Sequence, residues 1–233
     1  MAEYRPNLSL RLNTVIDTVV KCGTIADIGC DHGYVGMSLV REGIASSAIC
    51  CDINKGPLTA AEDNIKAAGL EDRIETRLSN GLHNIKPEDK IESIVIAGMG
   101  GSLMAEILEE GRKIVEGLSQ LVLQPQSELF LVRSKVRELS MHIESEKFIK
   151  DMGKYYWIMD VRRGKSESMG SMQDFYDKYS KYLIDNKDNL YREYIKESVE
   201  INKGYLEGIE ASKQGPLLTK IEELERVLEL IGQ

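Results

Sequence analysis

The sequence predicts an α/β protein with a doubly wound, mainly parallel sheet, followed by an all-helical C-terminal region. Over roughly the first two-thirds of the 233 residues, short apolar runs rich in β-branched side chains alternate with amphipathic segments. This alternation is typical of strands and helices that wrap around a buried parallel sheet. Beyond about residue 172, strand signals are almost absent and apolar residues recur at helical spacing, which predicts a second, helical domain.

Five apolar runs predict the parallel strands, because each has the length of a buried strand and is bounded by Gly, Asn, Asp or Pro. These runs are Thr24–Ile28, Ser47–Asp52, Ile74–Leu78, Ser93–Ala97 and Leu121–Leu123. The segments around them predict amphipathic helices at Leu8–Lys21, Tyr34–Arg41, Lys55–Ala68, Ser102–Glu110 and Leu129–Ser140. Asn54 lies where the N-cap of the third helix would be, and Gly69 lies at its C′ position, so this helix has both a start and a stop signal.

The region after residue 140 has a different pattern. His142–Lys150 and Lys154–Val161 flank the turn residues Asp151-Met152-Gly153, which predicts a hairpin that closes the sheet. The segment Arg163–Met172 is rich in Gly, Ser and Met and predicts a linker.

Two helices are predicted in the C-terminal region. Leu190–Ile209 and Leu217–Ile231 carry apolar residues at helical spacing, and Gly215-Pro216 separates them. We therefore expect an antiparallel, coiled-coil-like helical pair in a domain of residues 164–233, after a sheet domain of residues 1–163. RNA binding and dimerisation are both open as roles for this pair.

The composition is that of a globular protein, with 42% hydrophobic and 29% charged residues and a formal net charge of −8. No run approaches the about 18 apolar residues of a membrane span, and no apolar core follows the first charges of MAEYRPNLSLRLN, so no secretory signal is expected. The four cysteines show no CxxC spacing, which favours neither a zinc site nor a disulfide framework. We expect reduced thiols, no metal and a cytoplasmic location.

The basic residues are unevenly distributed. Residues 129–165 contain nine Lys and Arg against five Asp and Glu, whereas both flanking regions are acidic. The nine are Arg133, Lys135, Arg137, Lys147, Lys150, Lys154, Arg162, Arg163 and Lys165. Such a cluster can bind the backbone of a nucleic acid, although a solvated charged face is an equally good interpretation.

The first predicted strand ends in the glycine-rich segment Asp27–Tyr34, which leads directly into a helix, as in the ligand-binding turns of doubly wound folds. The dinucleotide pattern GxGxxG does not fit, because Asp31 and Tyr34 occupy its second and third glycine positions, and this disfavours a dehydrogenase. The pattern is DxGxDxG instead, which resembles the first motif of class I S-adenosylmethionine-dependent methyltransferases, usually (D/E)xGxGxG. S-Adenosylmethionine carries an ammonium and a sulfonium but no phosphate, so acidic side chains suit it.

Two further strand ends fit the same cofactor. Asp52 lies twenty-three residues after Gly29, where an acidic side chain can accept from both ribose hydroxyls of an adenosine, and the resemblance places Ile53 against the adenine. A helix cap is the alternative role for Asp52. Asn80-Gly81 follows the third strand, where these enzymes commonly have Asp-Gly. The Asn80 amide oxygen can still accept from the adenine amine, although Asn-Gly is also an ordinary turn pair.

The fourth strand ends in Ile96-Ala97-Gly98-Met99-Gly100-Gly101, where three glycines let a ligand approach the backbone closely. Methyltransferases that act on exocyclic adenine amines often carry (D/N)PP(Y/F) at this place. That motif is not present in the sequence, so methylation of an exocyclic amine is not favoured.

Four segments point to one family: Ser9–Leu12, Ala26–Tyr34, Ile96–Gly101 and Leu123–Pro125 occur in this order. Together they resemble the bacterial tRNA (adenine-N1)-methyltransferases that act at tRNA position 22, over nearly the whole chain. The resemblance implies a Rossmann-like class I methyltransferase sheet, S-adenosylmethionine as cofactor and tRNA as partner. The chain departs from the family at Asn80, where Asp is frequent, and at Gln126, where Asn is frequent.

The resemblance also assigns roles to single residues. The residues that would bind the cofactor are Asp27, Gly29, Asp31, His32, Gly33, Asp52, Ile53, Asn80, Gly81, Ala97, Gly98 and Met99. The residues that would frame the target base are Arg11, Gly100, Gly101, Gln124 and Pro125. Adenine N1 has an in-plane lone pair and needs no general base, so Asp31 is expected to act in catalysis through its charge. A cap or passive contact is expected for His32, and either packing or a place in the wall of the cofactor site for Tyr34.

Two alternatives stay open on sequence alone. The chain could be a methyltransferase for another RNA or a small molecule, or a non-catalytic protein that binds S-adenosylmethionine and RNA. Methyl transfer to unmodified tRNA separates the first alternative from a tRNA enzyme. Cofactor binding without transfer to any cellular RNA would favour the second.

Overall fold

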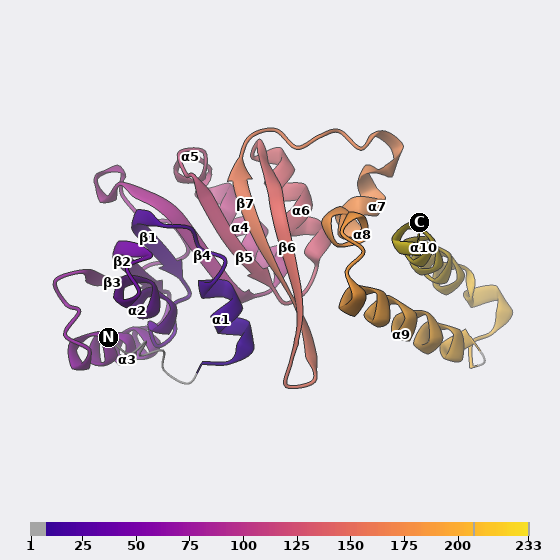
Figure 1. Ribbon diagram of the computed structural model, residues 1–233, viewed down its shortest axis with the longest axis horizontal. Helices are drawn as coiled ribbons and strands as arrows, with labels where there is room; N and C mark the ends of the chain where they lie inside the picture. Colours follow the sequence, from indigo (N-terminus) through magenta and orange to yellow (C-terminus); the bar gives the residue numbers. More distant parts are fainter. Residues whose placement is uncertain (1–7, 207, 233) are drawn as a thin grey trace. The chain divides into compact units, whose positions relative to one another are not determined.

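The computed structural model describes residues 8–206 and 208–232. Within these residues, seven strands form one sheet in the order β3-β2-β1-β4-β5-β7-β6 (Figure 1). The strands are β1 (Cys22–Ile28), β2 (Ala45–Asp52), β3 (Ile74–Leu78), β4 (Ile91–Met99), β5 (Gln120–Pro125), β6 (Met141–Asp151) and β7 (Lys154–Arg163). Strands β1 to β5 pair in parallel, and β7 and β6 extend the sheet beyond β5 as an antiparallel hairpin. The predicted α/β sheet with a closing hairpin is confirmed.

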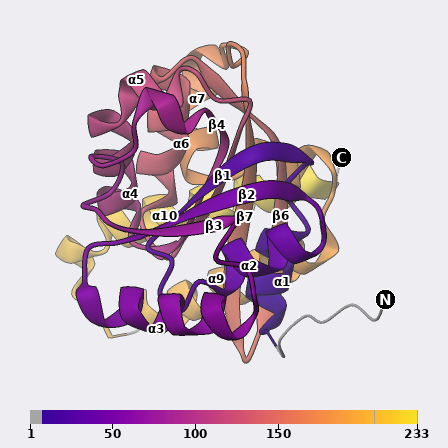
Figure 2. The ribbon, with the colours of Figure 1, turned by 90° about the vertical axis from the view of Figure 1, so that its left-hand side faces the viewer.

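The helices around the sheet form two layers, one on each face (Figure 2). They are α1 (Leu10–Ile16), α2 (Tyr34–Arg41), α3 (Lys55–Ala67), α4 (Gly101–Glu110), α5 (Arg112–Val115) and α6 (Leu129–Glu138). Helices α1 to α3 share a core with Ile25 and Val95, whereas α4 to α6 share a core with Ala26 and Ile94. Neighbouring strand residues enter opposite cores because successive side chains of a strand point to opposite faces.

Helix α1 is shorter than predicted. It ends at Ile16, whereas the apolar spacing predicts a helix to Lys21. Beyond it, the backbone N–H of Val20 donates to the buried side-chain oxygen of Gln120 at 3.0 Å. This bond joins segments 100 residues apart, so helical periodicity does not reveal it. The prediction also lacks the short helix α5.

The start of α3 has a different cap from the expected one. Asn54 is the N-cap residue and Gly69 has a φ of 63°, both as predicted. However, the Asn54 side chain makes no capping hydrogen bond. The backbone N–H of Asn54 instead donates to Asp52 Oδ1 at 2.8 Å, so a carboxylate at the tip of β2 holds this turn.

A second compact unit begins at Ser168, a few residues beyond the domain boundary predicted at 163/164. Its helices are α7 (Gln173–Lys178), α8 (Lys181–Asp185), α9 (Asn189–Leu206) and α10 (Gly215–Gly232). Helices α9 and α10 pack on each other, and Ile195, Val199 and Leu224 are buried. The predicted C-terminal helical region is confirmed, with α7 and α8 as unpredicted additions. Among the described residues, no helix combines the length and the apolar character that crossing a membrane requires.

Candidate functional site

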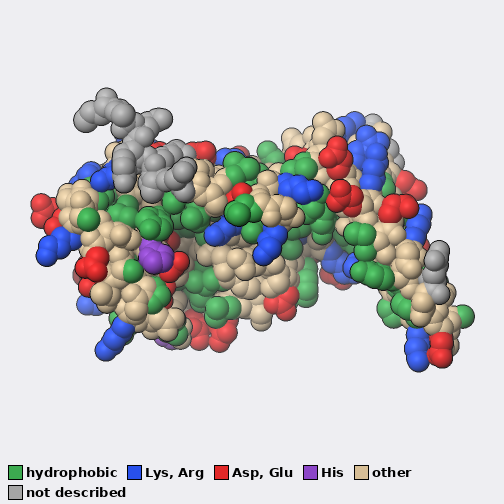
Figure 3. All heavy atoms as spheres, turned by 90° about the horizontal axis from the view of Figure 1, so that it is seen from below, with side chains coloured by type: hydrophobic (Ala, Val, Ile, Leu, Met, Phe, Trp, Pro, Cys, Tyr) green, Lys and Arg blue, Asp and Glu red, His purple; other side chains and the backbone are tan. Residues whose placement is uncertain are grey.

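The carboxyl edge of the parallel strands is the place where this topology positions a ligand. Strands β1 and β4 are neighbours at the centre of the sheet, and the chain leaves them for helices on opposite faces. Ligands of doubly wound folds bind at the carboxyl edge, at such a reversal of strand order. Figure 3 looks onto this edge, where charged and histidine side chains lie among exposed hydrophobic ones.

The turn after β1 is built around the buried carboxylate of Asp27. Its Oδ2 accepts a hydrogen bond from the backbone N–H of Gly36 at 3.3 Å, which ties the strand to the first turn of α2. Burial raises the pKa of Asp27 to about 7, since the charged form loses its hydration. Gly29 and Gly33 have φ values of 73° and 74°, a left-handed conformation that glycine adopts without strain. The glycines of the motif at these two positions therefore have a backbone cause.

Asp31 is an exposed residue of this turn. Its φ is 50°, a left-handed value that Asp tolerates better than most residues. Its side chain is 71% exposed, and His32 Nε2 lies 3.6 Å from its Oδ1. The His32 ring stacks on Tyr34 with ring centroids 5.6 Å apart, and its backbone carbonyl accepts from Asn64 Nδ2 at 3.1 Å. The turn thus presents an accessible carboxylate beside an oriented histidine.

The tip of β2 carries a second carboxylate, that of Asp52, and only one of its oxygens accepts a hydrogen bond among the described residues. Asp52 is buried, and its Oδ1 accepts from the backbone of Asn54. Within residues 8–206 and 208–232, no hydrogen bond is formed by Asp52 Oδ2. The next residue, Ile53, is 61% exposed. A carboxylate oxygen with an apolar side chain beside it suits the ribose and base of an adenosine.

The end of β3 adds polar and apolar groups to the same edge. Asn80 is exposed, and Gly81 has a φ of 54° and lies against Ile107 of α4. Leu103 precedes Ile107 by one helical turn and is 47% exposed. Leu103 was not among the predicted site residues. The sequence feature that could have indicated Leu103 is its position in the first turn of α4, the helix that follows the glycine-rich end of β4.

Strand β4 ends in a bulge at Gly98. The ladder to β5 pairs Ala97 with Gln124 and Met99 with Pro125, so Gly98 has no partner in it and adopts a φ of 82°. The bulge explains why β4 extends to Met99, beyond its predicted end. The Met99 side chain covers Gly29, since a Cβ on that glycine would overlap Met99 Cε. The turns after β1 and β4 therefore meet directly.

Gly101 serves helix packing. Its backbone N–H donates to the Ser127 carbonyl at 3.1 Å, and a Cβ would overlap the carbonyls of Ser127 and Glu128. Gly100, the preceding residue, is partly exposed. The close approach of α4 to the segment before α6 accounts for the glycine at 101, and a contact of Gly101 with substrate stays a prediction.

Arg11 is brought to this edge from the first helix. Its Nη1 donates to Gln124 Oε1 at 2.7 Å, its backbone N–H donates to Asp151 Oδ2 at 2.9 Å, and its guanidinium lies 5.7 Å from the Tyr156 ring centroid. The structure thus brings together Arg11, Gln124 and, at the bulge, Gly98. Asp151 and Tyr156 were not predicted, because only the fold places the hairpin beside α1.

Three residues of the predicted basic cluster form ion pairs with carboxylates. Arg133 is buried and bonded to Glu146, with Nη2 2.9 Å from Oε2. Lys135 pairs with Glu109 and Glu138, and Arg162 pairs with Asp160. Arg133 therefore cannot belong to a nucleic-acid surface, because it is buried, and nucleic-acid binding by the exposed members of the cluster stays a prediction.

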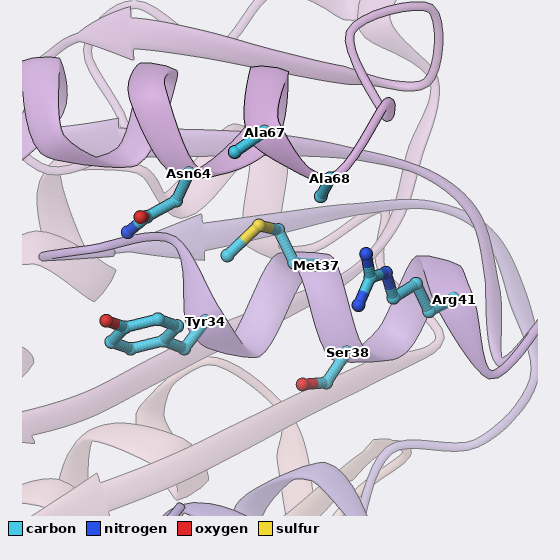
Figure 4. Close-up of a pocket in the computed structure, with 7 residues that line it drawn as sticks. All are labelled: Tyr34, Met37, Ser38, Arg41, Asn64, Ala67 and Ala68. Carbon is cyan, nitrogen blue, oxygen red and sulfur yellow. The ribbon is translucent and has the colours of Figure 1, made fainter. Parts of the chain in front are cut away.

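A groove of about 170 Å³ lies between α2 and α3. Figure 4 shows its lining residues Tyr34, Met37, Ser38, Arg41, Asn64, Ala67 and Ala68. Tyr34, which could line the cofactor site by prediction, lines this groove, whereas none of the residues predicted to contact the cofactor or the target base does. Elsewhere, the cysteines are buried free thiols, and residues 8–206 and 208–232 contain no group of three or more His, Cys, Asp or Glu suited to a metal.

Comparisons with known proteins agree with this geometry. Residues 8–159 match a family model described as a methyltransferase domain. The tRNA (adenine(22)-N(1))-methyltransferase of Bacillus subtilis is 34% identical over 161 residues, which cover 69% of this chain and 67% of that protein. The B. subtilis tRNA methyltransferase TrmK has a TM-score of 0.79 at 28% identity, covering 97% of both chains. M. capricolum TrmK, solved with S-adenosyl-homocysteine, has a TM-score of 0.86 at 27% identity, covering 96% of this chain and 99% of that one. The chain belongs to the tRNA (adenine(22)-N(1))-methyltransferase family.

Proposed function

We propose that this protein transfers the methyl group of S-adenosylmethionine to N1 of adenine 22 in tRNA. Family membership supports the reaction and the acceptor, and the S-adenosyl-homocysteine complex of M. capricolum TrmK supports the cofactor. One observation in this chain carries the proposal. Asp31, which is exposed, and Asp52, which has one carboxylate oxygen without a hydrogen bond among the described residues, flank glycine turns at the carboxyl edge. This acidic edge suits a cationic adenosine and disfavours a phosphate.

The cofactor would lie across the tips of β1, β2 and β3. Asp52 Oδ2 would accept from the ribose hydroxyls, because its other oxygen is already bonded to Asn54. Ile53 and Leu103 would cover the adenine with apolar surface, and Asn80 would accept from the adenine amine. When bound, S-adenosylmethionine supplies a methyl group that its sulfonium makes electrophilic.

The residues around the acceptor would orient it and exclude water. Adenine N1 attacks through an in-plane lone pair, so no side chain has to remove a proton, and positioning supplies the rate increase. The methylated base is cationic, and the Asp31 carboxylate would stabilise that developing charge. His32, 3.6 Å away, would orient this carboxylate and would not act as a general base.

The target base would enter beside the bulge at Gly98, framed by Arg11, Gln124 and Pro125. A base stacked in folded tRNA must first be turned out of its stack to reach a methyl group. We propose residues 1–163 as the catalytic domain and residues 164–233 as a separate helical domain. A tRNA substrate also supports the expected cytoplasmic location.

The proposed function is tested with labelled S-adenosylmethionine and two unmodified tRNA transcripts, one with adenine and one with guanine at position 22. We expect label only in the adenine transcript, together with a reverse-transcription stop next to position 22, because an N1-methyl group blocks base pairing. Equal labelling of both transcripts, or label without that stop, would contradict the proposal.

The role of Asp31 is tested separately with Asp31→Ala and Asp31→Asn. Loss of the charge should lower kcat on tRNA by about 10-fold or more, since electrostatic stabilisation of this kind is usually worth several kcal/mol. Asp72→Ala, an exposed residue of the α3–β3 loop, is the control. Normal methylation by a cofactor-bound Asp31→Ala protein removes Asp31 from the mechanism.

A further inference from the structure

The side-chain amide of Gln126 lies beside the bulge in β4 and makes no hydrogen bond among the described residues. The backbone N–H of Gln126 donates to the Met99 carbonyl at 2.8 Å, which holds residue 126 at the carboxyl edge directly after β5. The side chain is exposed, and Nε2 lies 3.7 Å from the point where a Cβ on Gly98 would stand. Arg11 Nη1 lies 3.5 Å from the same point. Gln126 therefore borders the space in which the target base is proposed to lie.

Gln124 and Gln126 differ in the hydrogen bonds of their side chains. Gln124 is buried, its Oε1 accepts from Arg11, and its Nε2 donates to the Pro125 carbonyl at 3.1 Å. Over the described parts of the chain, 8–206 and 208–232, no hydrogen bond engages the side-chain amide of Gln126. Gln124 thus completes the internal structure, whereas the Gln126 amide has both a donor and an acceptor available for a ligand.

The chemistry of N1 methylation restricts how a protein can hold the adenine. A donor to N1 would occupy the lone pair that has to attack the methyl group. The amine N6–H and the acceptor N7 form the other edge that distinguishes adenine, and a Gln carboxamide matches this pair with two hydrogen bonds. Guanine presents two acceptors, O6 and N7, on that edge, so the Oε1 atom of Gln would face O6 without a proton between them.

We infer that Gln126 is a specificity-determining residue that binds N6–H and N7 of the target adenine and leaves N1 free for methylation. This inference rests on the proposed function, and it assigns to one exposed side chain the choice of adenine over guanine. Oε1 of Gln126 accepts from N6–H, and Nε2 donates to N7.

The test combines three variants with two tRNA substrates. The variants are Gln126→Met, which removes both bonds, Gln126→Glu, which keeps the acceptor and loses the donor, and Glu106→Met, an exposed control substitution on α4. The substrates carry adenosine or 7-deazaadenosine at position 22, and the second has no N7 acceptor. Cofactor affinity and thermal stability of each variant show that the fold is retained.

With adenosine at position 22, kcat/KM should fall about 10- to 100-fold for Gln126→Met and Gln126→Glu, and stay unchanged for Glu106→Met. With 7-deazaadenosine, wild type should lose activity, and Gln126→Glu should match wild type, because the donor to N7 no longer matters. An adenosine activity of Gln126→Met within twofold of wild type, or an undiminished gap between Gln126→Glu and wild type on 7-deazaadenosine, would overturn the inference. Wild-type protein that does not methylate adenine 22 would overturn the proposed function itself.

Discussion

Arg11 Nη1 donates a hydrogen bond of 2.7 Å to Gln124 Oε1, which joins the first helix to the end of β5 across 113 residues of sequence. Gln124 is completely buried, so no water molecule can replace Arg11 as the donor to its side-chain oxygen Oε1. The backbone of Arg11 also donates to Asp151 Oδ2 at 2.9 Å. Helix α1 is therefore bonded to both the central sheet and the hairpin.

We expect Arg11 and Gln124 to act as one unit. Arg11→Met and Gln124→Met should each lower kcat/KM on tRNA by about 10-fold, because each leaves a polar group without its partner next to the base. The double variant should lose less than the product of the two single losses, with a coupling of about 1–2 kcal/mol. Steady-state kinetics of the four proteins measure this cycle, and strictly multiplicative losses would show that the two residues act independently.

Asp52 is predicted to determine cofactor affinity. Asp52→Ala should raise the Kd for S-adenosylmethionine about 10- to 100-fold, since hydrogen bonds to a charged group contribute about 1.5–3 kcal/mol. Asn54→Ala is the matched control, because the Asn54 side chain makes no capping bond and only its backbone contacts Asp52. Calorimetric titration gives both values. A Kd for Asp52→Ala equal to that of Asn54→Ala would exclude a ribose contact.

Asp27 should make stability depend on pH. Its pKa is about 7 in the folded protein and near 3.8 when exposed, so the unfolded chain binds fewer protons between these values. The free energy of unfolding therefore falls as pH rises from about 4 to about 7 and is constant above that range, as far as this group contributes.

An Asp27→Asn protein has no charge to bury. From pH 5 to pH 8, its stability relative to wild type should rise by about 2.5 kcal/mol, because the wild-type free energy of unfolding falls by up to about 1.4 kcal/mol per pH unit until the pH passes the folded pKa. Urea unfolding without cofactor at the two pH values measures this gain, with the exposed Asp72→Asn as control. A difference between Asp27→Asn and wild type that does not change with pH would contradict the raised pKa.

The ion pair between Arg133 and Glu146 should be structural. Its side chains are 4% and 1% exposed, so Arg133→Met should cost about 3–5 kcal/mol by leaving the Glu146 carboxylate buried without its partner. Arg133→Met combined with Glu146→Leu should recover most of that loss. Lys135→Met, whose carboxylate partners are exposed, should cost less than about 1 kcal/mol. Chemical denaturation distinguishes these outcomes; similar losses for Arg133→Met and Lys135→Met would refute the buried-pair interpretation.

Elements whose signals are local could be predicted well. Helix α2 and strand β3 have the bounds that the sequence predicts, because apolar spacing and flanking turn residues specify them within a short stretch. The turn from Asp27 to Gly33 was found for the same reason, since the left-handed φ values of Gly29 and Gly33 are a local requirement for glycine. The assignment of cofactor contacts to these residues stays a prediction.

Features that depend on distant partners could not be predicted. Charge counting placed Arg133 on a basic surface, whereas Arg133 lies on the buried face of α6 and pairs with Glu146 on β6. Periodicity predicts α1 to Lys21, whereas the helix ends at Ile16 and the backbone of Val20 is bonded to Gln120 on β5.

Residues adjacent in the chain determine the sequence of strands and helices along it. They also determine the acidic glycine turn, because backbone conformation and apolar periodicity are short-range properties. The neighbourhood of Gly98, Arg11 and Gln126 does not, since it depends on a bulge, a helix and a strand end that meet only when the sheet has assembled. Hydrogen bonding and burial between such distant segments are collective properties of the fold, and they determine which polar groups remain available at the carboxyl edge.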